Sequence, residues 1–261
     1  MRGHLSPHTS DPMLMPDLHF LVRPLFGLAL ASCLALPGVA QGNDAWTQLL
    51  ETYVHESTDG VNRVDYAALS ASTADRATLD TYIASFEARD LAGTDDATFA
   101  AWTNLYNAVT VRYIAEKYPL DSIRDGFLFG GPWKKVTVMA GGREVSLDAI
   151  EHDILRPRFG DSRVHYAINC ASYGCPNLLT RAWTANTLDA DLDAAARAYI
   201  NHPRGVTVGN RGLTVSSIYK WFEVDFGGSK DGVIKHLLQY AEPALAENIR
   251  ATPKIRGYTY D

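Results

Sequence analysis

The sequence has few cysteines and no cluster of basic residues. Its 261 residues include three cysteines, and 24 Lys and Arg stand against 30 Asp and Glu, which gives a formal net charge of −6. Three cysteines are too few for a small domain held together mainly by disulfides. A mildly acidic chain also lacks the basic stripe that neutralises nucleic-acid phosphates. We therefore expect neither a disulfide scaffold nor a nucleic-acid partner.

Several short motifs that mark well-known catalytic sites are absent as well. The sequence has no P-loop, no Gly-x-Gly-x-x-Gly fingerprint, no Gly-x-Ser-x-Gly elbow and no His-Glu-x-x-His pair. Nucleotide-binding, flavin-dependent, α/β-hydrolase and zincin activities therefore have no support in the sequence, and we predict neither a cofactor nor a metal site. The composition, with 46% apolar and 10% aromatic residues, is that of an ordinary globular domain.

The first forty residues are typical of a secretory signal peptide. Residues 24–40 carry no charge, follow Arg23 and end in small residues. The segment is short for a membrane span and contains two prolines. We predict that residues 1–40 are cleaved and that residues 41–261 are exported, to the periplasm or outside the cell, without a transmembrane anchor. The polar leader before Arg23 makes Met13 and Met15 alternative starts of translation.

A lipid anchor is the weaker alternative for the same segment. Leu30, Ala31, Ser32 and Cys33 resemble a bacterial lipobox, in which Cys33 would be lipidated. The residues after Cys33 stay apolar, whereas lipoproteins usually turn polar there. Ordinary cleavage near Ala40 is therefore the prediction that we prefer.

Residues 41–261 have the patterning of a single helix-rich α+β domain. Residues 96–118 predict its central helix, because no charge occurs between Asp96 and Arg112 and apolar side chains cover nearly every side. Gly141 and Gly142 predict the turn of an antiparallel hairpin. Further helices are expected over 43–55, 76–89, 147–155, 187–202, 217–222 and 231–240, and short strands over 135–140, 143–146, 163–170, 206–208 and 213–215.

The predicted helix over 147–155 carries a carboxylate on its apolar face. Glu151 lies in the middle of that face, and His152 lies at its flank. Burial of a bare carboxylate is too costly, so Glu151 must be paired, hydrogen-bonded or protonated. It is either a structural residue satisfied by an arginine or by backbone amides, or a group that orients a histidine or acts as an acid or base.

Three asparagines are candidates for binding. Asn104 and Asn107 lie on the buried helix, away from its aromatic stripe, and such amides need hydrogen-bond partners. Asn169 lies on the polar face of the predicted strand over 163–170. For the two helical asparagines, the alternatives are that they brace a neighbouring loop or that they line a pocket.

The two remaining cysteines lie at and after the end of that predicted strand. Alternation places Cys170 on its apolar face and His165 on its polar face. Cys175 precedes Pro176, and proline is favoured at the first position of a helix, whose dipole would lower the pKa of the thiol. Cys175 and His165 would then supply the nucleophile and the base of a thiol hydrolase.

The same two cysteines have a structural alternative. In an exported chain Cys170 and Cys175 can form a disulfide, and closing so short a loop stabilises the fold by roughly 2 kcal/mol. Inert thiols are a further alternative. Zinc bound by a cysteine with Glu151, His152 and His165 would lack any recognised spacing of ligands.

Trp221, Phe222 and Asp225 form a compact group of aromatic and acidic residues near the end of the chain. We expect both aromatic side chains to belong to the core. Asp225 is expected to cap a helix or to pair with an arginine.

Four motifs in order resemble the DUF547 family of uncharacterised proteins. They are Ala101–Ala108 (AWTNLYNA), Ser146–Arg156 (SLDAIEHDILR), His165–Cys170 (HYAINC) with Cys175 and Pro176, and Ile218–Phe226 (IYKWFEVDF). The resemblance covers about residues 45 to 260. Ala101 stands where the family usually has Phe, a mild change on the core side.

Members of this family have no settled activity, so the resemblance implies a fold and a grouping of motifs but no reaction. It groups the following residues into one shared site: Asn104, Asn107, Glu151, His152, His165, Cys170 and Cys175.

Three functions remain open at this point. The first is an exported thiol-dependent hydrolase or acyl-transferase for an amide or ester, such as a peptide or cell-wall fragment. Its nucleophile would be Cys175, with Cys170 in reserve. His165 or His152 would be its base, and Glu151 or Asn104 would orient that base.

The other two functions do not use a free thiol as the nucleophile. One is a non-catalytic domain that binds a ligand or partner and contains a structural Cys170–Cys175 disulfide. The other is a metal-dependent hydrolase that uses Glu151, His152, His165 and a cysteine.

Overall fold

The long helix α4 (Asp96–Lys117) is the buried centre of the N-terminal half of the chain. The computed structural model describes residues 38–125 and 131–261, so Cys33 and nearly all of the predicted signal peptide lie outside the described residues. Asp95 caps the start of the helix, and its carboxylate accepts a hydrogen bond from the Thr98 N–H at 2.8 Å. From Thr98 to Ala115 nearly every residue is buried. The predicted central helix is confirmed.

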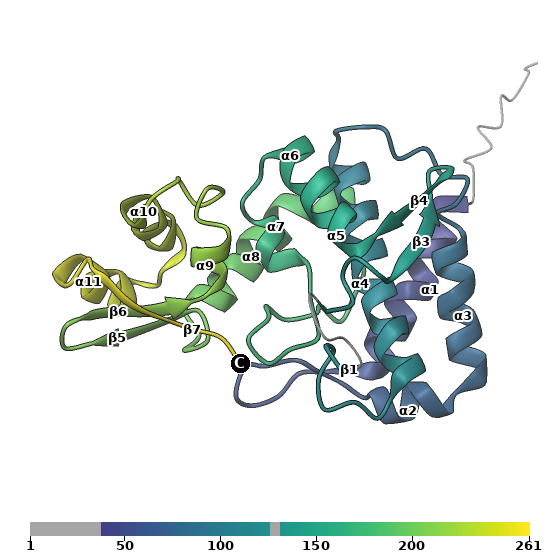
Figure 1. Ribbon diagram of the computed structural model, residues 1–261, viewed down its shortest axis with the longest axis horizontal. Coiled ribbons are helices and arrows are strands. Elements are labelled where there is room, and N and C mark those ends of the chain that lie inside the picture. The colour runs from purple at the N-terminus through teal and green to yellow at the C-terminus, as the bar shows by residue number, and fades with distance from the viewer. Residues whose placement is uncertain (1–37, 126–130) are drawn as a thin grey trace, which may run out of the picture. The chain divides into compact units, whose positions relative to one another are not determined.

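Three further helices belong to the N-terminal part of the chain, where two of them contact α4 and the third packs against those two (Figure 1). They are α1 (Gly38–Tyr53), α2 (Tyr66–Ala71) and α3 (Thr73–Ala84). The two-residue strands β1 (Val54–His55) and β2 (Arg63–Val64) form an antiparallel pair between α1 and α2. Helix α2 and this pair are additions to the predicted elements.

The predicted hairpin is present as β3 (Thr137–Ala140) and β4 (Arg143–Ser146). Gly141 and Gly142 both have positive φ angles, 57° and 75°, which a two-residue turn of this kind requires. The Ser146 hydroxyl then accepts a hydrogen bond from the backbone N–H of residue 149 at 3.1 Å and caps the following helix.

That following helix differs from the simple α-helix predicted over 147–155. It consists of α5 (Leu147–Ala149), the π-helix η1 (Ile150–Leu155) and α6 (Arg156–Phe159). The Arg156 N–H bonds to the Glu151 carbonyl five residues earlier, which is the spacing of a π-helix. Such wide turns are rare and are frequently found at functional sites.

The strand predicted over 163–170 is wrong. Residues Val164–Ala167 form a helical turn, α7, and the chain becomes extended only at Ile168. All four residues of α7 are buried, so there is no exposed face to which an alternating pattern could correspond. The helix expected at Cys175 and Pro176 is also absent, because residues 175–179 form a loop without helical structure.

The C-terminal part contains a small mixed sheet with helices packed against it. Strand β6 (Gly212–Ser216) pairs with β5 (Val206–Gly209) in the predicted antiparallel hairpin and with β7 (Ile255–Thr259) in parallel. The surrounding helices are η2 (Ala185–Thr187, a 3₁₀ turn), α8 (Leu188–Ile200), α9 (Ile218–Trp221), α10 (Lys230–Tyr240) and α11 (Pro243–Ala251). Strand β7 and α11 were not predicted.

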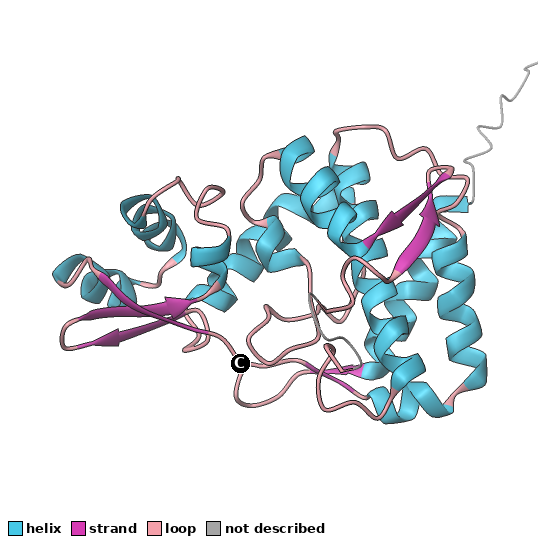
Figure 2. Cartoon of the chain, viewed as in Figure 1, coloured by secondary structure: helices cyan, strands magenta, loops and turns pink. Residues whose placement is uncertain are grey.

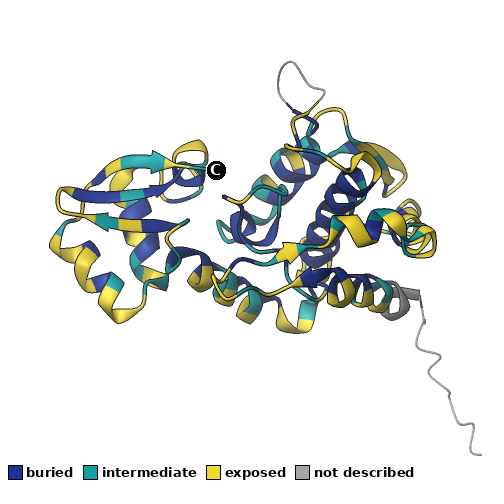
Figure 3. Cartoon of the chain, turned by 90° about the horizontal axis from the view of Figure 1, so that it is seen from below, coloured by how far each residue is buried: buried dark blue, intermediate teal, exposed yellow. Residues whose placement is uncertain are grey.

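Helices with short, mostly antiparallel strands confirm the predicted α+β class (Figure 2). One large apolar cluster surrounds α4, and another joins α8, α9 and α10 to the three-stranded sheet. Many of the helices bury one side and expose the other (Figure 3). Within the described residues, no helix has the length and apolar character needed to cross a membrane.

Candidate functional site

A cavity of about 250 Å³ brings five of the predicted site residues together. Tyr106 and Ile168 come to it from the cluster around α4, and Ile218 comes from the C-terminal cluster. The predicted residues in its wall are Glu151, His152, His165, Cys170 and Cys175. A cavity lined by residues from both clusters, with aromatic walls and a few polar groups, has the character of a small-molecule site.

Glu151 is the buried acid of this cavity. The residue is 8% exposed, and its Oε2 lies 3.4 Å from the Tyr106 hydroxyl, which donates to it. Burial raises the pKa of the Glu151 carboxyl to about 7, although the positive charge of Arg156 acts in the opposite direction. Near neutral pH this carboxyl is therefore partly protonated and can both give and take a proton.

His152 lies next to Glu151 and is neutral at pH 7. Its Nδ1 accepts a hydrogen bond from Nη1 of Arg156 at 3.2 Å, which leaves the ring proton on Nε2. That Nε2 is 3.8 Å from Oδ1 of Asp148. Burial lowers the pKa of His152 even though Asp148 raises it. Its Nδ1 lone pair is thus already used, which weakens the prediction of His152 as a free base.

His165 belongs to an ion-pair network rather than to a cysteine pair. Its Nε2 lies 2.7 Å from Oδ2 of Asp225, and Arg156 binds both oxygens of the same carboxylate at 2.5 and 3.0 Å. Desolvation lowers the pKa of the buried His165. Partial burial of Asp225 acts to raise the pKa of its carboxyl, but the hydrogen bonds from His165 and Arg156 hold that pKa far below its usual range. The expected arginine partner of Asp225 is confirmed.

One aromatic side chain that we expected in the core is exposed. Trp221 is 57% exposed and stands at the cavity beside the Tyr260 ring, with 4.8 Å between ring centroids. Phe222 is half-buried and stacks on His165 at 4.1 Å. Trp221 is the last residue of the short helix α9.

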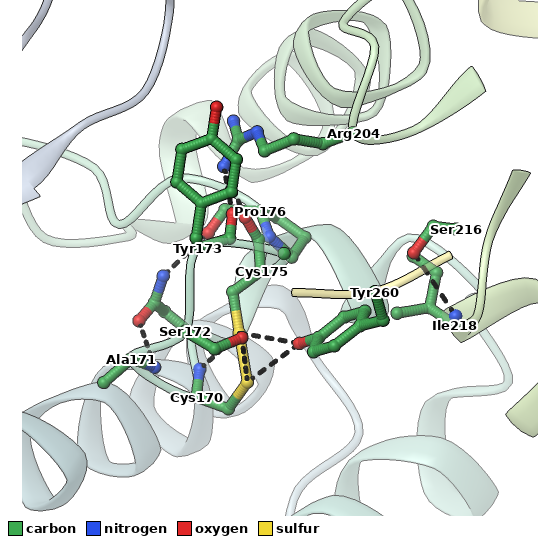
Figure 4. Close-up of a disulfide and its surroundings, with 12 residues drawn as sticks. Cys170, Ala171, Ser172, Tyr173, Cys175, Pro176, Arg204, Ser216, Ile218 and Tyr260 are labelled. Carbon is green, nitrogen blue, oxygen red and sulfur yellow. Dashed lines mark hydrogen bonds between the residues drawn. A yellow bond between two sulfur atoms is a disulfide. The ribbon is translucent and has the colours of Figure 1, made fainter. Parts of the chain in front are cut away.

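Cys170 and Cys175 are joined by a disulfide in the wall of the cavity (Figure 4). This is the structural alternative for the pair, and in this state neither sulfur is a free nucleophile. The Tyr260 hydroxyl lies 3.1 Å from each sulfur, and the Cys170 N–H donates to the Cys175 sulfur at 3.0 Å. The other hydrogen-bonding contacts of the sulfurs are with the Ser172 hydroxyl, at 3.6 and 3.8 Å.

The three asparagines brace loops and do not line this cavity. Asn107 donates to the Ala167 carbonyl at 2.9 Å and accepts from the Asn169 N–H at 2.8 Å. Asn104 makes the same pair of bonds with the backbone of Trp183. The Asn169 side chain accepts a hydrogen bond from the N–H of residue 171 and donates one to the carbonyl of residue 176. It therefore links the two ends of the disulfide loop.

Some residues of the site were not predicted from the sequence. Tyr260, Tyr106 and Trp133 line the cavity, and Arg156 holds both His152 and Asp225. Arg156 has a signal in the sequence, since it lies four residues after His152 on one helical segment. Tyr260 has none, because only the pairing of β7 with β6 brings the end of the chain to the disulfide.

The described residues offer no group of three or more His, Cys, Asp or Glu side chains that could hold a metal ion. The zinc set of Glu151, His152, His165 and a cysteine is therefore not assembled here.

Residues 92–200 match the family described as "Protein of unknown function, DUF547". The match includes α4, the π-helix and both cysteines of the disulfide, and it ends before Phe222, Asp225 and Tyr260. Searches of the curated proteins and of the solved structures found no match.

Proposed function

We propose an activity for the cavity, whose Glu151, His165 and disulfide lie within the segment that matches the DUF547 family. The chain is an exported hydrolase or acyl-transferase for a small amide or ester, and Glu151 is its general acid and base. Export follows from the signal-peptide pattern of residues 1–40. The periplasm or the cell exterior is the proposed location.

The observation that carries this proposal is the buried carboxyl of Glu151 in the cavity wall. Its pKa of about 7 means that near neutral pH both the acid and the base form are present, and a group transfers protons most effectively when its pKa is close to the surrounding pH. As a carboxylate, Glu151 removes a proton from the attacking water or acceptor alcohol. As a carboxylic acid, it returns a proton to the leaving amine or alcohol.

The charge of the cavity limits the substrate. Among the described residues, the acidic groups in its wall are the carboxyls of Asp148 and Glu151, and no lysine or arginine lines it. A neutral or cationic substrate is therefore favoured over an anion, because an anion would approach like charge in a poorly solvated space. Trp133, Trp221 and Phe222 provide apolar walls for a ring or an alkyl group.

The thiol-dependent hydrolase is a second candidate, supported by the presence of His165 and both sulfurs in one cavity. It needs reduction of the disulfide, after which Cys175 or Cys170 would attack the substrate carbonyl. This candidate requires activity that appears only with a reductant and is lost in Cys175→Ala. The Glu151 proposal requires activity in the oxidised protein.

A panel of neutral and cationic amides and esters, incubated with the oxidised protein, tests the proposal. For a substrate that is turned over, Glu151→Gln is expected to lower kcat by roughly 10²- to 10⁴-fold, because an amide cannot transfer the proton. The exposed Glu247→Gln on α11 is the matched control and should keep full activity. Equal activity of wild type and Glu151→Gln would overturn the proposal, and saturable binding without turnover would favour the non-catalytic alternative.

A further inference from the structure

The two cysteines of the Cys170–Cys175 disulfide differ in the exposure of the whole residue. Both line the cavity, but Cys175 is 2% exposed, whereas Cys170 is only half-buried. A nucleophile that enters the cavity therefore reaches the Cys170 sulfur more easily. The Cys175 sulfur accepts the backbone N–H of Cys170 within the same loop (Figure 4).

The two sulfurs also differ in the hydrogen-bond donors around them. The Cys175 sulfur accepts a fixed backbone N–H from Cys170 at 3.0 Å, and the hydroxyls of Tyr260 and Ser172 lie 3.1 and 3.6 Å away. The Cys170 sulfur is within reach of the same two hydroxyls, at 3.1 and 3.8 Å. Cys175 alone of the two accepts a backbone donor, so a negative charge is better stabilised on its sulfur.

From this asymmetry we propose that the disulfide is a thiol–disulfide exchange site for small dithiols. A thiolate of the dithiol attacks the Cys170 sulfur from the cavity, and Cys175 leaves as a thiolate that its donors stabilise. Exchange is faster when the leaving thiol is more acidic, and the hydrogen bonds to Cys175 provide that acidity.

The exchange is balanced without any further reactant. The first sulfur of the dithiol forms a bond with Cys170 as the Cys170–Cys175 bond breaks. The second thiol of the dithiol then attacks the mixed disulfide and displaces the Cys170 thiolate. The dithiol loses two electrons and becomes a disulfide, the protein gains them as two thiols, and the two protons pass from the dithiol through solvent to the cysteines.

Tyr260 is the residue that distinguishes this site from a purely structural disulfide. Burial raises the pKa of its phenol, so the hydroxyl keeps its proton and remains a donor. Its position is fixed on both sides, because the Asp261 carbonyl accepts the Gly174 N–H at 2.7 Å and the Trp221 ring packs against it. A bridge that only links two parts of a loop does not need a donor aimed at both sulfurs.

The test compares reduction rates of the oxidised, folded protein with dithiothreitol as the dithiol. Samples are quenched with an alkylating agent, and intact mass and peptide mapping follow each cysteine. Tyr260→Phe keeps the ring and removes the donor, and it is expected to slow reduction by about tenfold. Tyr258→Phe, two residues away on β7, is the matched control and should reduce at the wild-type rate.

A second measurement follows the pH dependence of alkylation in the reduced protein, in which the reactivity of Cys175 should rise at a lower pH than that of Cys170 because its donors favour the thiolate. The proposal is overturned if the disulfide is reduced only when denaturant unfolds the chain, or if the two tyrosine variants behave alike. The hydrolysis assay uses the oxidised protein without any thiol, so failure of the proposed hydrolysis and failure of this proposal are separate results.

Discussion

At the scale of single residues, burial decides the chemistry of Glu151. The carboxyl is buried in the cavity wall and receives a hydrogen bond from the Tyr106 hydroxyl, while Arg156 makes its two carboxylate hydrogen bonds to Asp225. The desolvation cost of the ionised form is therefore only partly offset. The result is an acid that changes its protonation state near pH 7.

This shifted pKa predicts a pH dependence of stability. A carboxyl that binds its proton more tightly in the folded state stabilises the fold below its unfolded pKa of about 4.5, and the contribution is lost as pH rises to about 7. Relative to Glu151→Gln, the wild type should lose about 3 kcal/mol of unfolding free energy over that interval. Urea unfolding of both proteins at several pH values measures the difference, and parallel curves would refute the prediction.

At the scale of elements, the disulfide loop is held by side chains of a helix that is remote in sequence. Asn107 on α4 binds the backbone on both sides of Ile168, and Asn169 continues the support into the loop. This loop includes Ala171 with a φ of 59°, a left-handed conformation that costs a non-glycine residue about 1 kcal/mol. The asparagine bonds hold the chain in that conformation.

Removal of the Asn107 side chain should lower the free energy of unfolding. Asn107→Ala leaves the buried Ala167 carbonyl and the half-buried Asn169 N–H without their partner, which is expected to lower the unfolding free energy by about 2 kcal/mol. The exposed Asn248→Ala on α11 is the control and should change it by less than about 0.5 kcal/mol. Denaturant titrations compare the two variants, and equal effects would show that the asparagine bonds do not support the loop.

The same elements show what the sequence could predict. The buried helix α4, both hairpins and the Ser146 cap follow from local patterns, namely all-round apolarity, glycine turns and a capping hydroxyl. Helix α7 could not be predicted from a local pattern. Its residues alternate like those of a strand but are all buried, and Asn107 binds the backbone at the end of the helix. The π-helical turn could not be predicted either, because the sequence pattern was compared only with the spacing of an α-helix.

At the scale of the whole described chain, the cavity is a product of long-range packing. Its walls combine α4, the π-helix, the disulfide loop, α9 and Tyr260, which no local pattern brings together. Sequence reasoning found Glu151, His152, His165 and the cysteines because each is a chemically reactive residue in a short motif. It missed Tyr260 because the parallel pairing of β7 with β6 is a tertiary event.

The most direct test of the proposed role of Glu151 is a titration of its carboxyl carbon by ¹³C NMR. The signal is assigned by its absence in Glu151→Gln, and the oxidised protein is used throughout. We expect a midpoint near pH 7, raised from 4.5 by burial. A midpoint at the ordinary value would mean that Glu151 is fully ionised at neutral pH, and it could not then donate a proton in this cavity.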